Sequence, residues 1–343
     1  MHFAFDEQQL EFRAQLRAFA DKQCTPADIR LAWESDLGWS RQRWAALAEM
    51  GVVGLTVPAE RGGLGLGLVD LVLLLEEAGR AGLPEPLLET TALAAPALAA
   101  TVISGGARTR ADGWLEQIAR GEAAAAVGMS WMPVVPGAAA ADVLLLERGG
   151  DLHGALRQDV QIEPRAALDG TRRPAVVHFE PSAPSLLVAG QHAHEVLAGL
   201  RDRAVMGTGA VLVGVADRLL SMAARYAGER VQFGKPIGSF QAVKHLLADA
   251  LVRVEFARPA VYRAAWSLDT GHRDAGAHAS MAKALASDAA TGAARAALQV
   301  HGAIGYTWEH DLHLWMKRAW ALAAAWGDAP HHRARVLEAA LGH

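Results

Sequence analysis

The stretch RVQFGKPIGSFQ, residues 230–241, is the most informative part of this chain. It lies between two long segments with helical apolar spacing, and it places a fixed cation, Arg230, beside an aromatic ring and an amide in one short loop. A guanidinium is always charged and can fork onto phosphate oxygens, and the first turn of a helix favours anions. The loop therefore predicts a site for a pyrophosphate whose nucleotide packs against the ring.

A second glycine-rich stretch, QVHGAIGYTWEH at residues 299–310, follows the next helical segment. Its glycines allow a backbone to approach a ligand closely. The cluster GGLGLG at 62–67 resembles a dinucleotide fingerprint only superficially, because no strand–turn–helix unit with a later acidic residue surrounds it. Residues 230–241 and 299–310 are therefore the candidate cofactor motifs.

The composition limits the classes of protein. A chain of 343 residues indicates two or three domains, and 52% hydrophobic residues can build large helical cores. The net charge of −4 gives no support for a nucleic-acid-binding surface. Cys24 is the one cysteine, which excludes an intrachain disulfide; we expect it to be structural. No signal peptide and no uncharged apolar window of about 18 residues is found, so we expect no membrane span and a cytoplasmic location.

Three regions differ in their hydrophobic pattern. Residues 1–120 and 193–343 have helical spacing, and the latter region breaks near Gly234, Gly271, 302–305 and 327–330. Residues 121–192 contain short strand-like runs, two of them joined by a Gly-Gly hairpin signal. This order predicts an α+β chain with an N-terminal all-α domain (1–120), a reduced middle β domain (121–192) and a C-terminal four-helix bundle (193–343). The strand-like runs are 124–129, 143–147, 152–156, 176–179 and 186–189.

The three-part order and the two motifs resemble the acyl-CoA dehydrogenase family over nearly the whole length. The resemblance is strongest from Arg203 to Arg333, and YAGERVQFGKPIGSFQ at 226–241 is its most specific part. It implies bound FAD, an acyl-CoA thioester as substrate, α,β-desaturation as the reaction, and an electron-transfer flavoprotein as electron acceptor. It also implies an oligomer in which each flavin is held partly by a neighbouring subunit.

The resemblance assigns cofactor-binding roles within both motifs. Arg230 would contact the FAD pyrophosphate, and Phe233 would pack on the adenine side. Gln299 and Gly302 would approach the flavin of the partner, beside Ala303, which replaces a glycine that is usual in the family. For the apolar residues, ordinary helix packing is the alternative that their spacing alone also allows. The remaining residues of the cofactor trough would be Ile237, Phe240 and Val243.

The general base departs from the family pattern. Many members carry a glutamate after the last turn of a helix near the C-terminus, and that position falls on Gly327. Other members use a glutamate before an arginine in the first helix of the C-terminal domain, which corresponds here to Asp202, one methylene shorter. Two hypotheses follow: Asp202 is the base, or the chain has no base of its own.

The second hypothesis makes the chain similar to the short subunits of the heterotetrameric acyl-CoA dehydrogenases of actinobacterial steroid side-chain breakdown, in which a homologous partner supplies the glutamate. The middle region agrees, because residues 128–137 replace the loop that covers the flavin in the family, and only Ser130 offers a comparable hydroxyl. The alternative from another class is a non-catalytic subunit that stabilises or regulates a catalytic homologue. A different flavin reaction, such as N-oxidation, is a third option.

Other polar and aromatic residues have simpler interpretations. Glu309, His310, Asp311 and His313 could be read as metal ligands, but we expect them to form a helix N-terminus and expect no metal site. Asp328 is expected to cap the last helix, with His331 and His332 facing solvent. We expect the tryptophans to pack at helix interfaces; they include Trp308, Trp315, Trp320 and Trp326.

Overall fold

The computed structural model of the chain describes residues 4–101 and 106–342. These residues form two compact units, which we describe separately. One unit comprises residues 29–71 and 84–204, and the other comprises residues 1–28, 72–83 and 205–343. The helices are α1 (Glu7–Gln23), α2 (Pro26–Glu34), α3 (Arg41–Glu49), α4 (Leu68–Ala81), α5 (Ala95–Ala99), α6 (Gly106–Ala119), α7 (Gly190–Glu229), α8 (Gln241–Asp269), α9 (Ala275–His301), α10 (Leu312–Ala324) and α11 (Ala329–Leu341).

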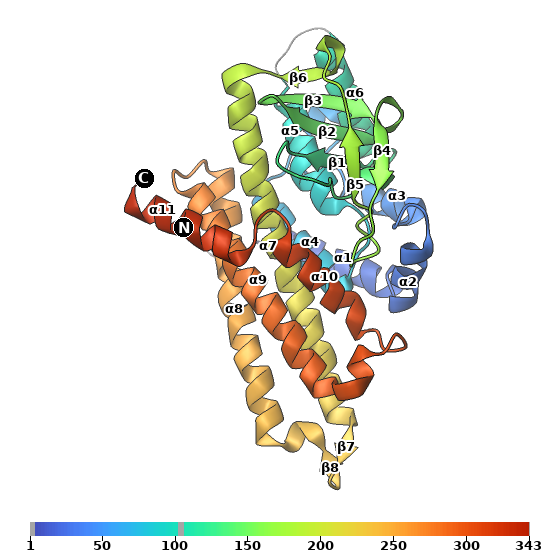
Figure 1. Ribbon diagram of the computed structural model, residues 1–343, viewed down its shortest axis with the longest axis vertical. Coiled ribbons are helices and arrows are strands. Elements are labelled where there is room, and N and C mark those ends of the chain that lie inside the picture. The colour runs from blue at the N-terminus through green and yellow to red at the C-terminus, as the bar shows by residue number, and fades with distance from the viewer. Residues whose placement is uncertain (1–3, 102–105, 343) are drawn as a thin grey trace. The chain divides into compact units, whose positions relative to one another are not determined.

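The unit formed by residues 29–71 and 84–204 contains the main sheet (Figure 1). Its strands lie in the order β1-β2-β3-β6; β1 pairs with β2 in parallel, and the other pairs are antiparallel. Arg148 pairs with Asp151, and Gly149 and Gly150 between them have φ of 62° and 87°, as a two-residue hairpin turn requires. The strands are β1 (Ala125–Gly128), β2 (Val143–Arg148), β3 (Asp151–Leu156), β4 (Gln161–Pro164), β5 (Ala175–His178) and β6 (Leu186–Val188).

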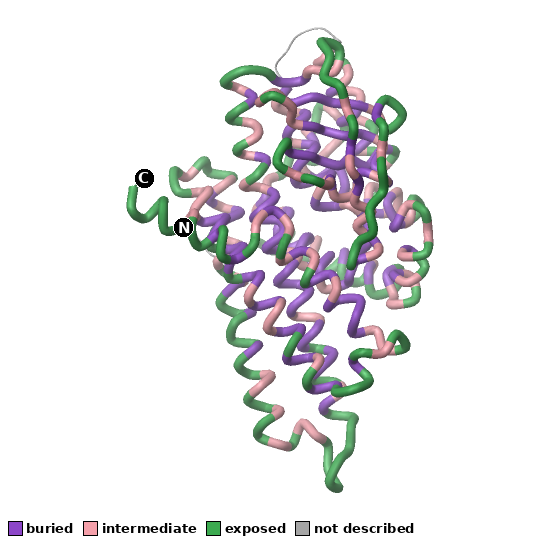
Figure 2. The backbone as a smooth tube through the Cα atoms, viewed as in Figure 1, coloured by how far each residue is buried: buried purple, intermediate pink, exposed green. Residues whose placement is uncertain are grey.

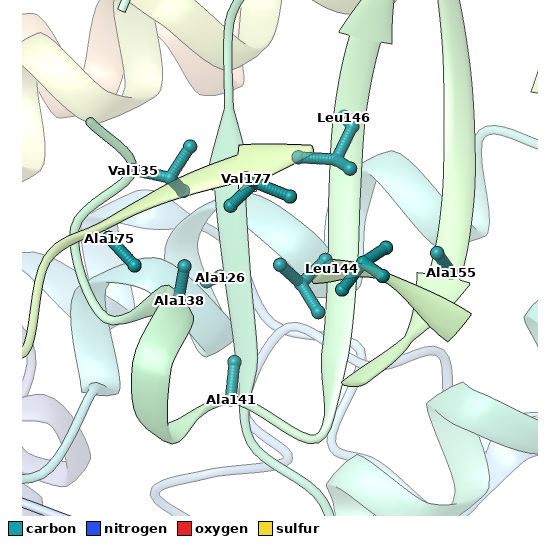
Figure 3. Packing of buried hydrophobic residues seen from close by; sticks show 10 residues of the cluster. Ala126, Val135, Ala138, Ala141, Leu144, Leu146, Ala155, Ala175 and Val177 are labelled. Atoms are coloured by element: carbon teal, nitrogen blue, oxygen red, sulfur yellow. The ribbon is translucent and has the colours of Figure 1, made fainter. Parts of the chain in front are cut away.

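A small apolar core holds this sheet and the separate β4–β5 ribbon. Leu144 and Leu146 of β2 lie close to Val177 of β5, with Val135 and several alanines around them (Figure 3). Each of these side chains is at most 8% exposed. Leu144 and Leu146 lie on the same face of β2, because successive side chains of a strand point to opposite faces.

The other unit is a bundle of long helices (Figure 1). From Val205 onward α7 belongs to it, and α9 packs against α8, α10 and α11. Alanine supplies most of the buried face of α9, which keeps the neighbouring helices close. Helices α4 and α7 approach even more closely: a Cβ on Gly214 would lie 1.8 Å from the carbonyl oxygen of Glu76, and one on Gly79 would lie 2.0 Å from that of Val211. Glycine is therefore required on both helices where they cross.

These elements confirm the predicted fold class of helical, small β and helical-bundle regions. The helix breaks at Gly234, Gly271, 302–305 and 327–330 also lie where the sequence places them. Strand β4 was not expected, because its residues are largely exposed and lack a continuous apolar run. The boundaries 1–120, 121–192 and 193–343 stay a prediction, since the two compact units are discontinuous in sequence.

Three side-chain predictions are wrong. His332 is fully buried rather than solvent-facing, because it lies on the inner side of α11; His331 is exposed as expected. Trp308 and Trp320 are 56% and 38% exposed, so they do not fill helix interfaces as Trp315 and Trp326 do. By contrast, Cys24, which we expected to be structural, is buried, and its thiol donates to the carbonyl oxygen of Ala81.

Among the described residues, one helix, Gly190–Glu229, is long and apolar enough by length and composition to cross a membrane. Its apolar window is 78% buried within the structure, as in a core helix.

Candidate functional site

The first motif forms a β-hairpin at the end of α7 (Figure 1). Strand β7 (Val231–Gln232) pairs with β8 (Lys235–Pro236), and Phe233 and Gly234 make the turn with φ of 53° and 79°. Positive φ at both central residues is the mirror-image turn that suits a two-residue hairpin. A residue other than glycine in this conformation costs about 1–2 kcal/mol. The hairpin is exposed along its length (Figure 2). It holds a strained aromatic residue, Phe233, that is 92% exposed.

Arg230 is fixed by its backbone and leaves its side chain available. Its N–H donates to the carbonyl oxygen of Tyr226 at 2.8 Å, and its own carbonyl oxygen accepts from the N–H of Ile237 at 2.8 Å. The residue is exposed, and within the part of the chain that the structure describes no ion pair engages its guanidinium. The geometry suits a cation that meets an external anion.

The apolar residues of the first motif lie around this hairpin. Phe233 and Phe240 meet edge to face with their centroids 6.1 Å apart, and the ammonium of Lys235 lies 4.5 Å above the Phe240 ring. Ile237, Phe240 and Val243 are half-buried. They therefore combine helix packing with an accessible edge.

The second motif ends α9 and continues into the 3-10 turn η7 (Gly302–Tyr306). Gln299 lies exposed in the last turn of α9, and Gly302 ends the helix with φ of 65°. No atom lies within 4 Å of the position that a Cβ on Gly302 would take, so its backbone faces open space. Ala303, the next residue, is exposed as well.

Three rings join the two motifs within one chain. Tyr226 of α7 stacks on His301 of α9, with centroids 4.4 Å apart and planes at 23°. His310 meets His301 at 4.6 Å. Nδ1 of His301 donates to the carbonyl oxygen of Ala297 at 2.7 Å, and burial, with repulsion from His310, lowers the pKa of His301. Sequence reasoning missed this cluster, although Tyr226 lies one helical turn before Arg230 and so on the same face.

At Gly327, which the resemblance aligns with the family glutamate, a side chain would be crowded. Its φ is 101°, and a Cβ would lie 2.6 Å from Cδ2 of His331 and 3.0 Å from Nε2 of His332. Trp326 before it also has a positive φ, of 59°. This loop conformation is therefore one that glycine permits and that a glutamate at 327 would disturb.

Two buried basic residues hold this loop, and sequence reasoning missed both. Lys283 is fully buried in α9, and its ammonium donates to the carbonyl oxygens of Ala323 and Gly327 at 3.0 Å each. Nε2 of His332 donates to the carbonyl oxygen of Trp326 at 3.0 Å. Burial, assisted by repulsion from Lys283, lowers the pKa of His332 to about 4. The loop is thus tied to α9 and α11 by groups that donate hydrogen bonds.

An open, mainly apolar groove of about 290 Å³ lies beside the same loop. Its walls come from α9, α10 and the first turn of α11, where the carboxylate of Asp328 accepts from the N–H of His331 at 2.9 Å and caps the helix as predicted. Asp288 in the groove forms an ion pair with Arg333. The acids here already have structural partners.

Asp202 lies in the first third of α7, whereas Arg230 follows its last residue. Its side chain is 16% exposed, and its carboxylate lies 3.8 Å from Nε of Arg201. Ser130, the hydroxyl of the replaced middle loop, is exposed, and its N–H donates to Glu147 at 2.7 Å. The roles suggested for both residues stay predictions.

The residues considered as metal ligands near the second motif make other contacts. Nδ1 of His310 accepts from the N–H of Leu312, and Nε2 of His313 donates to the carbonyl oxygen of Trp308. Over residues 4–101 and 106–342, the spacing for a metal ion occurs instead at His272, Asp274 and His278. Both ring nitrogens of His278 are already engaged, by Arg263 and Ser267 at 2.8 Å each, which argues against a ligand role.

Comparisons with known proteins agree with this description. Residues 6–122 match the N-terminal domain model of acyl-CoA dehydrogenases, and residues 202–341 match the C-terminal domain model. The chain is 35% identical to acyl-CoA dehydrogenase IpdE2 of Mycobacterium tuberculosis over 97% of its own length and 96% of that protein.

Two solved structures share the fold. The ChsE4-ChsE5 complex from M. tuberculosis matches with a TM-score of 0.85 and 24% identity, covering 99% of each chain. The G363A variant of the steroid acyl-CoA dehydrogenase Tcur3481-Tcur3483 matches with a TM-score of 0.86 and 24% identity, covering 98% of each chain. With both domain models and a full-length relative in agreement, the chain belongs to the acyl-CoA dehydrogenase family.

Proposed function

We propose that this chain is a subunit of a FAD-dependent acyl-CoA dehydrogenase that oxidises an acyl-CoA to its 2,3-enoyl-CoA, and that a homologous partner supplies the base. Gly327 carries the proposal. A side chain at 327 would need a strained backbone and would crowd His331 and His332, so we expect the carboxylate that desaturation needs to come from elsewhere.

The two motifs fit FAD as a ligand. Arg230 offers a free guanidinium for the pyrophosphate, Phe233 an exposed ring for the adenine, and Gly302 an open backbone face. Ile237, Phe240 and Val243 would line the trough, and Gln299 and Ala303 would border it. Bound FAD would accept the hydride from the β carbon of the thioester, while these residues bind and orient it. The exposure of both motifs in a single chain supports completion of the site by a second subunit.

The assembly we propose is a hetero-oligomer in the cytoplasm that passes electrons to an electron-transfer flavoprotein. Support comes from the two structural neighbours, each named as a pair of proteins. One of them is described as a steroid enzyme, so a steroid-derived acyl-CoA is the first substrate to test.

The deciding experiment compares this chain purified alone with the same chain co-expressed with a long homologue. We expect the flavin absorbance band and acyl-CoA-dependent reduction of an artificial electron acceptor only in the co-expressed complex. A yellow protein that is active alone would refute dependence on a partner. A stable complex without any acyl-CoA oxidation would instead favour the stabilising, non-catalytic subunit.

Two substitutions separate cofactor binding from the choice of base. Arg230→Gln removes a charged hydrogen-bond donor worth about 1.5–3 kcal/mol, so we expect FAD affinity to fall about tenfold or more. Arg225→Gln, also exposed and near the end of α7, is the matched control and should bind FAD normally. Asp202→Asn tests the rival base: unchanged turnover of the complex removes Asp202 from the chemistry.

A further inference from the structure

A small cavity of about 90 Å³ lies in the helical unit at the end of α1, apart from both motifs. Its wall comprises the end of α1, the start of α2, the end of α4 and the middle of α7. Two guanidinium groups, those of Arg80 and Arg218, line it together with the carboxylate of Asp21 and the thiol of Cys24. The volume is several times what one water molecule needs, so it has room for a tetrahedral anion.

Arg218 is the unusual member of this wall. It is half-buried, and its guanidinium lies 4.9 Å above the ring of Trp315. Among the described residues, no hydrogen bond or ion pair engages this guanidinium, and its Nε is buried without an acceptor. Burial, together with repulsion from Arg80 and Arg225, lowers the pKa of Arg218. A half-buried cation without an acceptor is costly unless an anion meets it.

The neighbouring carboxylates of Asp21 and Glu77 already accept hydrogen bonds from other arginines. Nη2 of Arg80 donates to Asp21 at 2.7 Å, and its Nε donates to Glu77. Glu77 also accepts from Nη2 of Arg17 at 2.7 Å. Arg17 and Arg80 therefore engage both Asp21 and Glu77, whereas Arg218 is attracted by Asp21 and Asp311 without forming an ion pair among the described residues.

The end of α4 would normally oppose an anion, because the last carbonyls of a helix carry partial negative charge. Here donors cover them. Nε1 of Trp315 donates to the carbonyl oxygen of Arg80 at 3.0 Å, Nη1 of Arg318 to that of Leu83 at 2.7 Å, and the thiol of Cys24 to that of Ala81 at 3.7 Å. With these carbonyl oxygens occupied, the guanidinium groups of Arg80 and Arg218 make the electrostatic potential in the cavity positive.

We propose that this cavity binds one small oxyanion, of the size of phosphate or sulfate, against Arg218 and Arg80. The site stands on these contacts alone and does not depend on the flavin chemistry, so either proposal can fail without the other. The carboxylate of Asp21 sets a limit: an anion must lie on the Arg218 side of the cavity.

The test uses the full-length chain and inorganic phosphate at constant ionic strength, balanced with sodium chloride. For a dissociation constant of about 1 mM, phosphate at about 20 mM should lower the unfolding constant about twentyfold. Arg218→Met should abolish this effect, and Arg225→Met, which removes the same charge from the same helix outside the cavity, should keep it. Equal stabilisation of wild type and Arg218→Met would overturn the site.

A second measurement needs no variant. Crystals of the wild-type protein soaked with selenate should show an anomalous peak in the cavity beside Arg218. An empty cavity in crystals that bind selenate elsewhere would overturn the proposal, even if Arg218→Met did not fold.

Discussion

Replacing Gly327 with alanine tests whether the loop before α11 has truly lost the space for a catalytic side chain. A left-handed backbone costs alanine about 1–2 kcal/mol. The new Cβ, 2.6 Å from His331 and 3.0 Å from Nε2 of His332, must also displace both rings. His331 is exposed and can turn away, but His332 is buried and would lose its hydrogen bond to Trp326, which costs about 1–2 kcal/mol more. We expect a total destabilisation of about 2–4 kcal/mol.

The assay is urea unfolding followed by tryptophan fluorescence, and the chain offers a matched control. Gly271, in the turn between α8 and α9, has φ of 62° and no atom within 4 Å of a built Cβ. Gly271→Ala therefore measures the backbone cost alone, about 1–2 kcal/mol. If Gly327→Ala is no more destabilising than Gly271→Ala, the steric part of the reasoning is wrong. Gly327→Glu should likewise fail to give the isolated chain dehydrogenase activity.

Two further outcomes follow from buried polar groups. The pKa of His332 is held at about 4 against an ordinary 6.5, so the unfolded chain binds more protons between these values. The free energy of unfolding should therefore fall by about 3 kcal/mol as the pH falls from 6.5 to 4, at 1.36 kcal/mol per pKa unit. His332→Gln should flatten this part of the plot of urea midpoint against pH. An unchanged slope would contradict the low pKa of His332. Tyr262→Phe removes the 2.6 Å hydrogen bond to the carboxylate of Glu76, whose pKa is raised by burial. It should lower the free energy of unfolding by about 1–3 kcal/mol. Tyr306→Phe, at an exposed ring, is the control and should have no measurable effect in the same assay.

The elements of this fold were predictable where a local pattern determines them. The Gly149-Gly150 hairpin and the break at Gly302 depend on backbone conformations that few residues other than glycine adopt, so the glycines predict them. Strand β4 carries no such signal, because its residues are mostly exposed and its pairing with β5 is supplied by the fold. The crossing of α4 and α7 depends on Gly79 and Gly214, which lie far apart in sequence and reveal their match only in three dimensions.

The candidate site, like the fold, could be predicted from the sequence only in part. Roles for Arg230 and Gly302 could be proposed from the sequence because each depends on a single residue in a short motif, and these roles stay predictions. The stack of Tyr226 on His301 was not, since it joins helices that are separated by the whole of α8. Nor could sequence distinguish His331, which is exposed, from His332, which is buried: adjacent residues on a helix differ in exposure only through what packs against them.

The loop before α11 gives the strongest physical reason to look for a partner. Lys283 and His332 reach its backbone from two helices, and both donate hydrogen bonds to its carbonyl oxygens. The same contacts make the loop a rigid support. Because the exposed candidate cofactor motifs and the loop with glycine at 327 belong to different helix ends, they are independent observations, and both favour a chain that completes its chemistry with a second subunit.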